Sequence, residues 1–327
     1  MERTEKHLAA SEKLIAVSVY FALATLVLLS GYVFPSETKS VTDVPIALSI
    51  LLLLPLHLWQ REHRAKNSPA KDIPTRNRDL TLFSVLALFA LALTVRIPSA
   101  LWFYQPYEKT PLIYLIVLTI LLIEKTDLSA FGFRTENLGK SVLQGLALFA
   151  VIGGVAAAFY YGIIYSVIGE MPIKGFNVVQ CLLVMPFMTL CVGISEEGLF
   201  RGYMQTHLEK AHGRERAILV QAVLFGIWHF VWNLKPFDPI GMTFYMVSTF
   251  FFGLLFGYVY SKTRNLVPVV LAHGLWNSIM PSIEETQRAL DASAPWLSPM
   301  IVAAIITLFV VHFLMKKSGA RAPSVNG

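Results

Sequence analysis

Long apolar runs are the feature that most constrains this chain. Several of them approach or exceed the roughly 20 residues that a helix needs to cross a bilayer. Of the 327 residues, 55% are hydrophobic and only 15% are charged, whereas a soluble domain of this length carries more charge. The runs are continuous and do not alternate with polar residues, so they favour helices over a β-barrel. The sequence therefore predicts an all-α, polytopic membrane protein.

The apolar runs predict ten helices, of which about eight to ten cross the membrane around a shallow polar pocket. Their expected bounds are Leu14–Phe34, Val44–Trp59, Leu80–Trp102, Pro111–Ile123, Ser141–Ile168, Val178–Leu208, Arg214–Trp232, Pro239–Tyr260, Leu266–Met280 and Leu297–Met315. The fourth and ninth helices are short, and we expect them to span only part of the bilayer. The longest polar connection, Gln60–Arg78, leaves no room for a soluble domain.

Lysine and arginine are distributed unevenly between the two sides of the predicted membrane. With the N-terminus inside, 21 of the 27 fall on the cytoplasmic side, and the other side holds Lys39, Lys109, Lys174, Lys235 and Arg288. This asymmetry follows the positive-inside rule and predicts both termini in the cytoplasm. The remaining cation, Arg96, lies within a helix beside Pro98, and we expect it to snorkel to the outer interface.

The formal net charge of +6 follows from this distribution and requires no nucleic-acid partner. We expect an integral protein of a plasma membrane or endomembrane, surrounded by membrane lipids.

Glu196 and Glu197 are adjacent carboxylates directly after the apolar run Val178–Ile194. Every other Asp or Glu falls in a segment with the composition of a loop or terminus. A carboxylate near the centre of a bilayer costs roughly 2.5 kcal/mol or more. The adjacent pair, followed four residues later by Arg201, therefore indicates a functional site. Glu197 and Arg201 share a helix face, so we expect them to pair and to leave Glu196 free.

Glu196 and His229 lie on successive predicted helices that turn near His212 and Gly213. Both positions are equally distant from this turn, so an antiparallel hairpin brings them to the same depth, about 25 Å from the turn at 1.5 Å per residue. Basic residues near the turn place part of the hairpin in the cytoplasm. We therefore expect a site inside the bilayer, nearer its cytoplasmic face and open toward the cytoplasm.

His273 and Asn277 lie one turn apart on a third helix and project from the same face. Because His273 lies about two turns from the cytoplasmic end of that helix, we expect it at a depth similar to that of Glu196. Glu196 and His229 could then activate a water molecule, while neutral His273 and Asn277 donate hydrogen bonds to an oxyanion. These parts suit the hydrolysis of an amide bond by water.

The same residues resemble the three ordered motifs of the CAAX-protease and bacteriocin-processing (CPBP) family of intramembrane proteases. The motifs are Glu196-Glu197-x-x-x-Arg201, Phe225-x-x-x-His229 and His273-x-x-x-Asn277. The resemblance covers roughly Val178–Met280, with a weaker likeness from Phe131-Gly132-Phe133 onward. That family includes the endopeptidase that trims prenylated CAAX proteins.

The resemblance implies an intramembrane endopeptidase whose substrate is a membrane-associated protein or peptide, with or without a lipid anchor. It implies that Glu196 and His229 activate water and that His273 and Asn277 stabilise the oxyanion, with Glu197 and Arg201 in support. It also divides the chain into N-terminal transmembrane helices (1–123), a CPBP-like protease core (124–281), and a C-terminal transmembrane helix with a cytoplasmic tail (282–327).

The family is often labelled metalloprotease, and the sequence supports this only in part. Glu196, His229 and His273 are residue types that could bind Zn²⁺, but the chain has no His-Glu-x-x-His pair. The same residues could equally work without metal, as a glutamate-type site.

Other interpretations of these residues stay open. The paired carboxylates could be solvated at a cytoplasmic helix end, and the histidines and Asn277 could join helices by hydrogen bonds. A family member could act as a scaffold or immunity protein that binds without cleaving. A transporter is a further alternative, because intramembrane carboxylates also mark ion paths, although no two halves of the sequence look alike.

Overall fold

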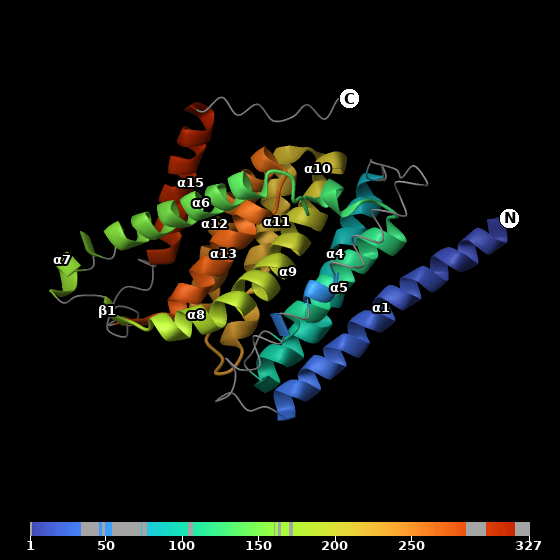
Figure 1. Cartoon of the computed structure of the whole chain (residues 1–327), viewed down its shortest axis with the longest axis horizontal. Coiled ribbons are helices and arrows are strands. Elements are labelled where there is room, and N and C mark those ends of the chain that lie inside the picture. Colours follow the sequence, from blue (N-terminus) through green and yellow to red (C-terminus); the bar gives the residue numbers. More distant parts are fainter. Residues whose placement is uncertain are drawn as a thin grey trace.

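Helices form most of the chain in the computed structural model (Figure 1). The structure describes residues 2–33, 46–47, 50–53, 73, 77–103, 107–159, 161–162, 165–169, 173–285 and 299–317. The predicted helix Val44–Trp59 falls largely outside the described residues; those described from that region are 46–47 and 50–53, which include a short 3₁₀ turn, Ile50–Leu52.

Within the described residues, four helical segments are long and apolar enough to cross a membrane: Arg78–Phe103, Leu138–Phe159, Val178–His212 and Pro239–Thr263. Shorter apolar helical stretches lie at Leu14–Leu29, Lys109–Ile123 and Ile301–Leu314. The prediction of an all-α polytopic membrane protein is confirmed. A single short antiparallel pair, β1 (Ile173–Phe176) with β2 (Ile283–Glu285), is the only β-sheet in the described part of the chain.

Most helices follow the apolar runs, but α1 begins at Glu2, well before the predicted start at Leu14. Their bounds are α1 (Glu2–Val33), α4 (Arg78–Pro98), α5 (Lys109–Leu118), α6 (Leu138–Phe159), α7 (Tyr165–Ile168), α8 (Val178–Pro186), α9 (Ile194–Glu197), α10 (Thr206–His212), α11 (Arg214–Trp228), α12 (Pro239–Thr263), α13 (Val267–Ile279) and α15 (Pro299–Lys317). Segments of π-helix extend α4, α5, α8 and α9, at Ser99–Phe103, Thr119–Ile123, Phe187–Gly193 and Gly198–Gln205. Short 3₁₀ helices follow at Leu128–Phe131, Phe230–Asn233 and Met280–Ser282.

One predicted helix ends earlier than its apolar run. The run Arg214–Trp232 was expected as one helix, but α11 ends at Trp228 and the chain continues as a 3₁₀ helix. Hydrophobicity continues past Trp228, so it does not reveal where the backbone leaves the α-helix. The run Ser141–Ile168 was also expected as one helix; the structure describes α6 to Phe159 and α7 at Tyr165–Ile168, and residues 160, 163 and 164 between them lie outside the described residues.

The central helices pack around the stretch Val178–His212. Helix α11 lies against α12, and α13 lies between α6 and the π-helical segment Phe187–Gly193. Helix α1 runs along one edge of the molecule beside α5 (Figure 1). Gly213, with φ of +86°, forms the turn between α10 and α11 that the sequence predicted. A glycine adopts this positive φ without the steric cost that a side chain would add.

Gly274 allows α13 to approach the π-helical segment Phe187–Gly193 closely. A Cβ atom at Gly274 would lie 2.5 Å from the Cα atom of Thr189, a backbone contact that cannot relax by a side-chain rotation. We expect Gly274→Ala to lower the free energy of unfolding by about 1–3 kcal/mol, because overpacking displaces α13. Thermal or denaturant unfolding in detergent would measure this loss.

Gly154→Ala on α6 is the matched control, since no atom lies within 4 Å of a Cβ built there. Alanine is the better helix former, so this control should unfold at the same or a slightly higher temperature. Equal stability of the two variants would contradict the close approach at Gly274.

Candidate active site

Glu196 and Glu197 lie on α9, a single α-helical turn between two π-helical segments. Single π-helical turns inside α-helices are rare and occur frequently at functional sites. The two residues are only 2% and 0% exposed, respectively. The alternative that these carboxylates are solvated at a helix end is therefore wrong, because the surrounding helices cover both.

Glu196 and His229 lie level with each other, as the hairpin argument predicted. The Nε2 atom of His229 is 3.8 Å from Oε2 of Glu196. The Nε2 atom of His273 approaches the same oxygen to 3.7 Å. Glu196 lies on α9, His229 directly follows α11 and His273 lies on α13, so three helices converge on one carboxylate oxygen. Both histidines are buried.

Hydrogen bonds at Nδ1 orient both imidazole rings. His229 bonds through Nδ1 to the Phe225 carbonyl oxygen at 2.8 Å, and His273 bonds through Nδ1 to Oε1 of Glu197 at 2.7 Å. A carbonyl and a carboxylate only accept, so Nδ1 carries the hydrogen in each ring. Nε2 of a neutral ring is then an acceptor. Only the imidazolium form of His273 can donate to an oxyanion through Nε2, which differs from the neutral donor expected from the sequence.

Glu197 and Arg201 form the expected ion pair, with Nη1 of Arg201 donating to Oε1 of Glu197 at 3.1 Å. Arg201 is fully buried, and its Nη2 also donates to the Gly253 carbonyl oxygen at 3.3 Å. Its guanidinium lies 4.2 Å from the centre of the Phe225 ring. Because Oε1 of Glu197 also accepts from His273, this pair orients an imidazole as well as supporting the helix.

Two cations that the sequence assigned to the outer side also lie at this site. Lys109 was expected in an outer loop and Arg96 at the outer interface, but each is only 1% exposed. Nζ of Lys109 pairs with Oε1 of Glu196. Arg96 pairs with Glu108 and donates from Nε to the Trp228 carbonyl oxygen at 2.7 Å.

Arg96 does not snorkel because a carboxylate and a carbonyl oxygen inside the protein accept its hydrogen bonds. The signal that could have found this contact was the presence of Arg96 within an apolar run. The nearest acid in the sequence, Glu108, begins the next helix beside Lys109.

With both histidines neutral, the buried charges of the site balance. They are the cations Arg96, Lys109 and Arg201 and the carboxylates Glu108, Glu196 and Glu197. A buried ion is costly unless it is paired and hydrogen-bonded. Pairing of opposite charges therefore explains how this cluster can lie inside an apolar helical bundle.

Two further acids lie in connecting segments, as expected, but are buried. Glu108 and Glu124 flank the helical stretch Lys109–Ile123 and are 1% and 5% exposed. Oε1 of Glu124 accepts a hydrogen bond from the Tyr203 hydroxyl at 2.9 Å. The connecting segments at both ends of this short helix thus fold into the protein interior.

Asn277 follows His273 by one turn of α13, as predicted, and is half-buried. Within the described part of the chain, its side chain makes no hydrogen bond to another residue of the site. Its role as an oxyanion donor therefore stays a prediction.

Glu196, His229 and His273 are residue types that bind Zn²⁺, and both histidines donate from Nδ1 as metal-bound histidines do. However, the described residues contain no group of three or more His, Cys, Asp or Glu side chains arranged to hold a metal ion. Oε1 of Glu196 is also paired with the Lys109 ammonium. This arrangement does not fit the zinc site that the sequence offered, and no step proposed below involves a metal.

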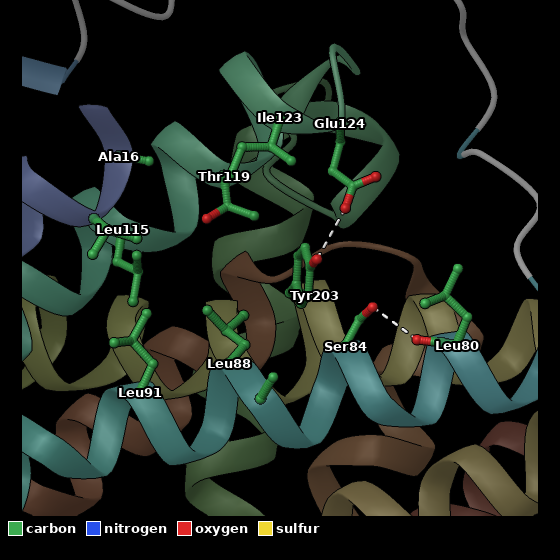
Figure 2. Close-up of a pocket in the computed structure, with 12 residues that line it drawn as sticks. Ala16, Leu80, Ser84, Leu88, Leu91, Leu115, Thr119, Ile123, Glu124 and Tyr203 are labelled. Carbon is green, nitrogen blue, oxygen red and sulfur yellow. Dashed lines mark hydrogen bonds between the residues drawn. The ribbon is translucent and has the colours of Figure 1, made fainter. Parts of the chain in front are cut away.

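A cavity of about 450 Å³ lies between α1, α4 and α5, as Figure 2 shows. Aliphatic side chains such as Leu88, Leu91 and Leu115 form much of its wall, and Glu124 and Tyr203 add polar groups to it. None of the predicted catalytic residues lines this cavity. Tyr203 belongs to the same continuous helical stretch, Val178–His212, as the paired carboxylates. This stretch therefore lines both the cavity and the carboxylate site.

These features define a class: a polytopic membrane protein with a buried site of paired carboxylates and histidines. The family model described as Rce1-like, type II CAAX prenyl endopeptidase, matches residues 178–279. The matched segment contains all three motifs, and this part of the chain is similar to the CAAX protease family. No curated protein matches the chain.

Proposed function

We propose that this protein is an intramembrane endopeptidase that hydrolyses a peptide bond of a membrane-associated protein or peptide. One observation carries the proposal: Oε2 of Glu196 faces Nε2 of His229 and Nε2 of His273, at 3.8 and 3.7 Å. This oxygen is buried and accepts no hydrogen bond from the described residues. It is therefore available as a base in a site that the surrounding helices shield from bulk solvent.

In the proposed reaction, a water molecule donates hydrogen bonds to Oε2 of Glu196 and Nε2 of His229. Glu196 takes a proton from the water as its oxygen attacks the carbonyl carbon of the substrate. The Asn277 amide and the imidazolium of His273 donate hydrogen bonds to the resulting oxyanion. Glu196 then returns the proton to the departing nitrogen, so the products are one carboxyl group and one amine.

The test is cleavage by the purified full-length chain in proteoliposomes. Isotope-labelled membrane proteins and membrane-anchored peptides would be supplied, and mass spectrometry would identify newly formed termini. Peptide-bond cleavage supports the proposal. Peptide binding without cleavage would favour the scaffold alternative, and an ion flux that depends on Glu196 would favour the transporter.

We further propose that the site opens toward the cytoplasm and that both termini lie on that side. The distribution of Lys and Arg supports this orientation. In vesicles of uniform orientation, cleavage of a peptide added to the cytoplasmic side alone is the expected result. Cleavage only from the opposite side would contradict it.

The cavity between α1, α4 and α5 supports a substrate that carries a hydrocarbon chain. Its volume of about 450 Å³ lies within the usual range for ligand pockets, and its walls are largely aliphatic. We expect Leu91→Trp, which fills the cavity, to reduce kcat/KM for a lipidated peptide about tenfold. That loss corresponds to about 1.4 kcal/mol, less than two buried methylene groups contribute. Cleavage of the same peptide without its lipid should change much less.

Leu146→Trp, at a position 44% exposed on α6, is the control for the added indole. It should leave both substrates unaffected. If Leu91→Trp weakened cleavage of the two peptides equally, the cavity would have no part in lipid recognition.

A further inference from the structure

The two carboxylate oxygens of Glu196 have different surroundings. Oε1 pairs with Nζ of Lys109 and accepts a hydrogen bond from Nε1 of Trp228 at 2.9 Å. Oε2 has no hydrogen-bond donor among the described residues and faces the two histidines. Two donors on one oxygen, one of them charged, determine how the carboxylate is turned.

Lys109 is itself held from several sides. Its Nζ lies 3.0 Å from Oε1 of Glu108 and 5.0 Å from the centre of the Trp228 ring. Arg96 pairs with the same Glu108 oxygen, and its guanidinium lies 4.2 Å from the Trp228 ring. These contacts hold the Lys109 side chain in one position. A side chain must itself be held in place before it can orient another.

We propose that Lys109 is a positioning residue for Glu196: it holds Oε1 so that Oε2 is the oxygen that takes the proton from water. This inference rests on the proposed function. Lys109, Arg96 and Glu108 all precede the matched segment 178–279. The N-terminal helices α4 and α5 thereby complete the site, instead of serving only to anchor it in the membrane.

The geometry gives a physical reason for this role. A carboxylate without Lys109 could turn partly about its side-chain bonds or pair with a histidine, which would displace the oxygen that faces the water. Displacement of a reacting group by about 1 Å can cost 10²-fold in rate. Binding of substrate does not depend on this orientation, so the loss should fall on kcat and leave KM largely unchanged.

The experiment compares Lys109→Met, Lys109→Arg and wild type in proteoliposomes, with the peptide that the wild-type protein cleaves. We expect Lys109→Met to lower kcat about 10- to 100-fold with KM changed less than about threefold. Lys109→Arg keeps a positive charge and hydrogen-bond donors. It should therefore recover at least half of the decrease in log kcat that Lys109→Met causes. Lys140→Met, at an exposed position on α6, controls for the loss of one lysine and should match wild type.

Unchanged kcat in Lys109→Met would overturn the positioning role, and so would a loss that Lys109→Arg does not recover. If Lys109→Met failed to fold, Trp228→Phe would replace it, since it removes the Nε1 donor and keeps an aromatic, though smaller, ring. That variant should lower kcat about threefold or more at unchanged KM, and a wild-type kcat would count against the proposal.

Glu196→Gln separates this inference from the function on which it rests. Activity lost in Glu196→Gln but kept in Lys109→Met overturns the positioning role alone. Absence of cleavage by the wild-type protein overturns both proposals.

Discussion

Glu196→Gln should abolish peptide-bond hydrolysis while leaving the helical structure intact. The glutamine amide oxygen can still accept from Lys109 and Trp228. Its NH₂ group would occupy the position of Oε2 and could donate to Nε2 of a neutral histidine. However, an amide cannot take a proton from water, and loss of a general base lowers rates by about 10²- to 10⁴-fold. Single-turnover cleavage in proteoliposomes, with circular dichroism to check helicity, would measure both effects.

Glu136→Gln is the matched control, because Glu136 is exposed before α6 and makes none of the contacts described at the site. It should cleave at the wild-type rate. If Glu196→Gln retained cleavage within about threefold of wild type, Glu196 would not be the base, and water activation would have to come from another group.

Arg201→Met should produce the largest loss of stability at the site. Removing Arg201 leaves Glu197 buried with His273 as its remaining partner. Breaking a buried ion pair from one side costs about 3–5 kcal/mol, because an uncompensated charge remains in the interior. The midpoint of unfolding in denaturant, with the purified protein in detergent, would report this change.

The double variant Arg201→Met with Glu197→Gln tests the cause. It removes both charges, so it should recover part of the stability that Arg201→Met loses. Arg216→Met on α11 is the surface control, since Arg216 is exposed, and it should change stability little. Equal losses in the single and double variants would show that packing against Phe225, rather than charge, dominates.

Local patterns in the sequence predicted much of the site. Glu197 and Arg201 pair because residues four apart share a helix face. Glu196 meets His229 because equal distances from the Gly213 turn give equal depths in a hairpin. Both arguments use only helix geometry along one stretch of chain, so a single sequence suffices for them.

The contacts of Arg96 and Lys109 could not be predicted in this way. Lys109 reaches Glu196 across 87 positions, and Arg96 reaches Trp228 across 132. Hydrophobic patterns report that a residue lies near a membrane span, but they do not report which neighbouring helix supplies a partner. The interfacial, snorkelling position expected for Arg96 was therefore wrong, because its side chain is buried inside the protein.

By itself, the sequence determined the membrane-spanning helical class, the turn at Gly213 and the residues of the three motifs. These depend on hydrophobicity and on the repeat of the helix, both of which are local properties of the chain. Only the tertiary structure decided that Oε1 of Glu196 bonds to Lys109 and Trp228 while Oε2 faces the histidines. The orientation of a side chain between helices from distant parts of the chain depends on how those helices pack. The free energy of a buried charge likewise depends on all the partners that packing places beside it.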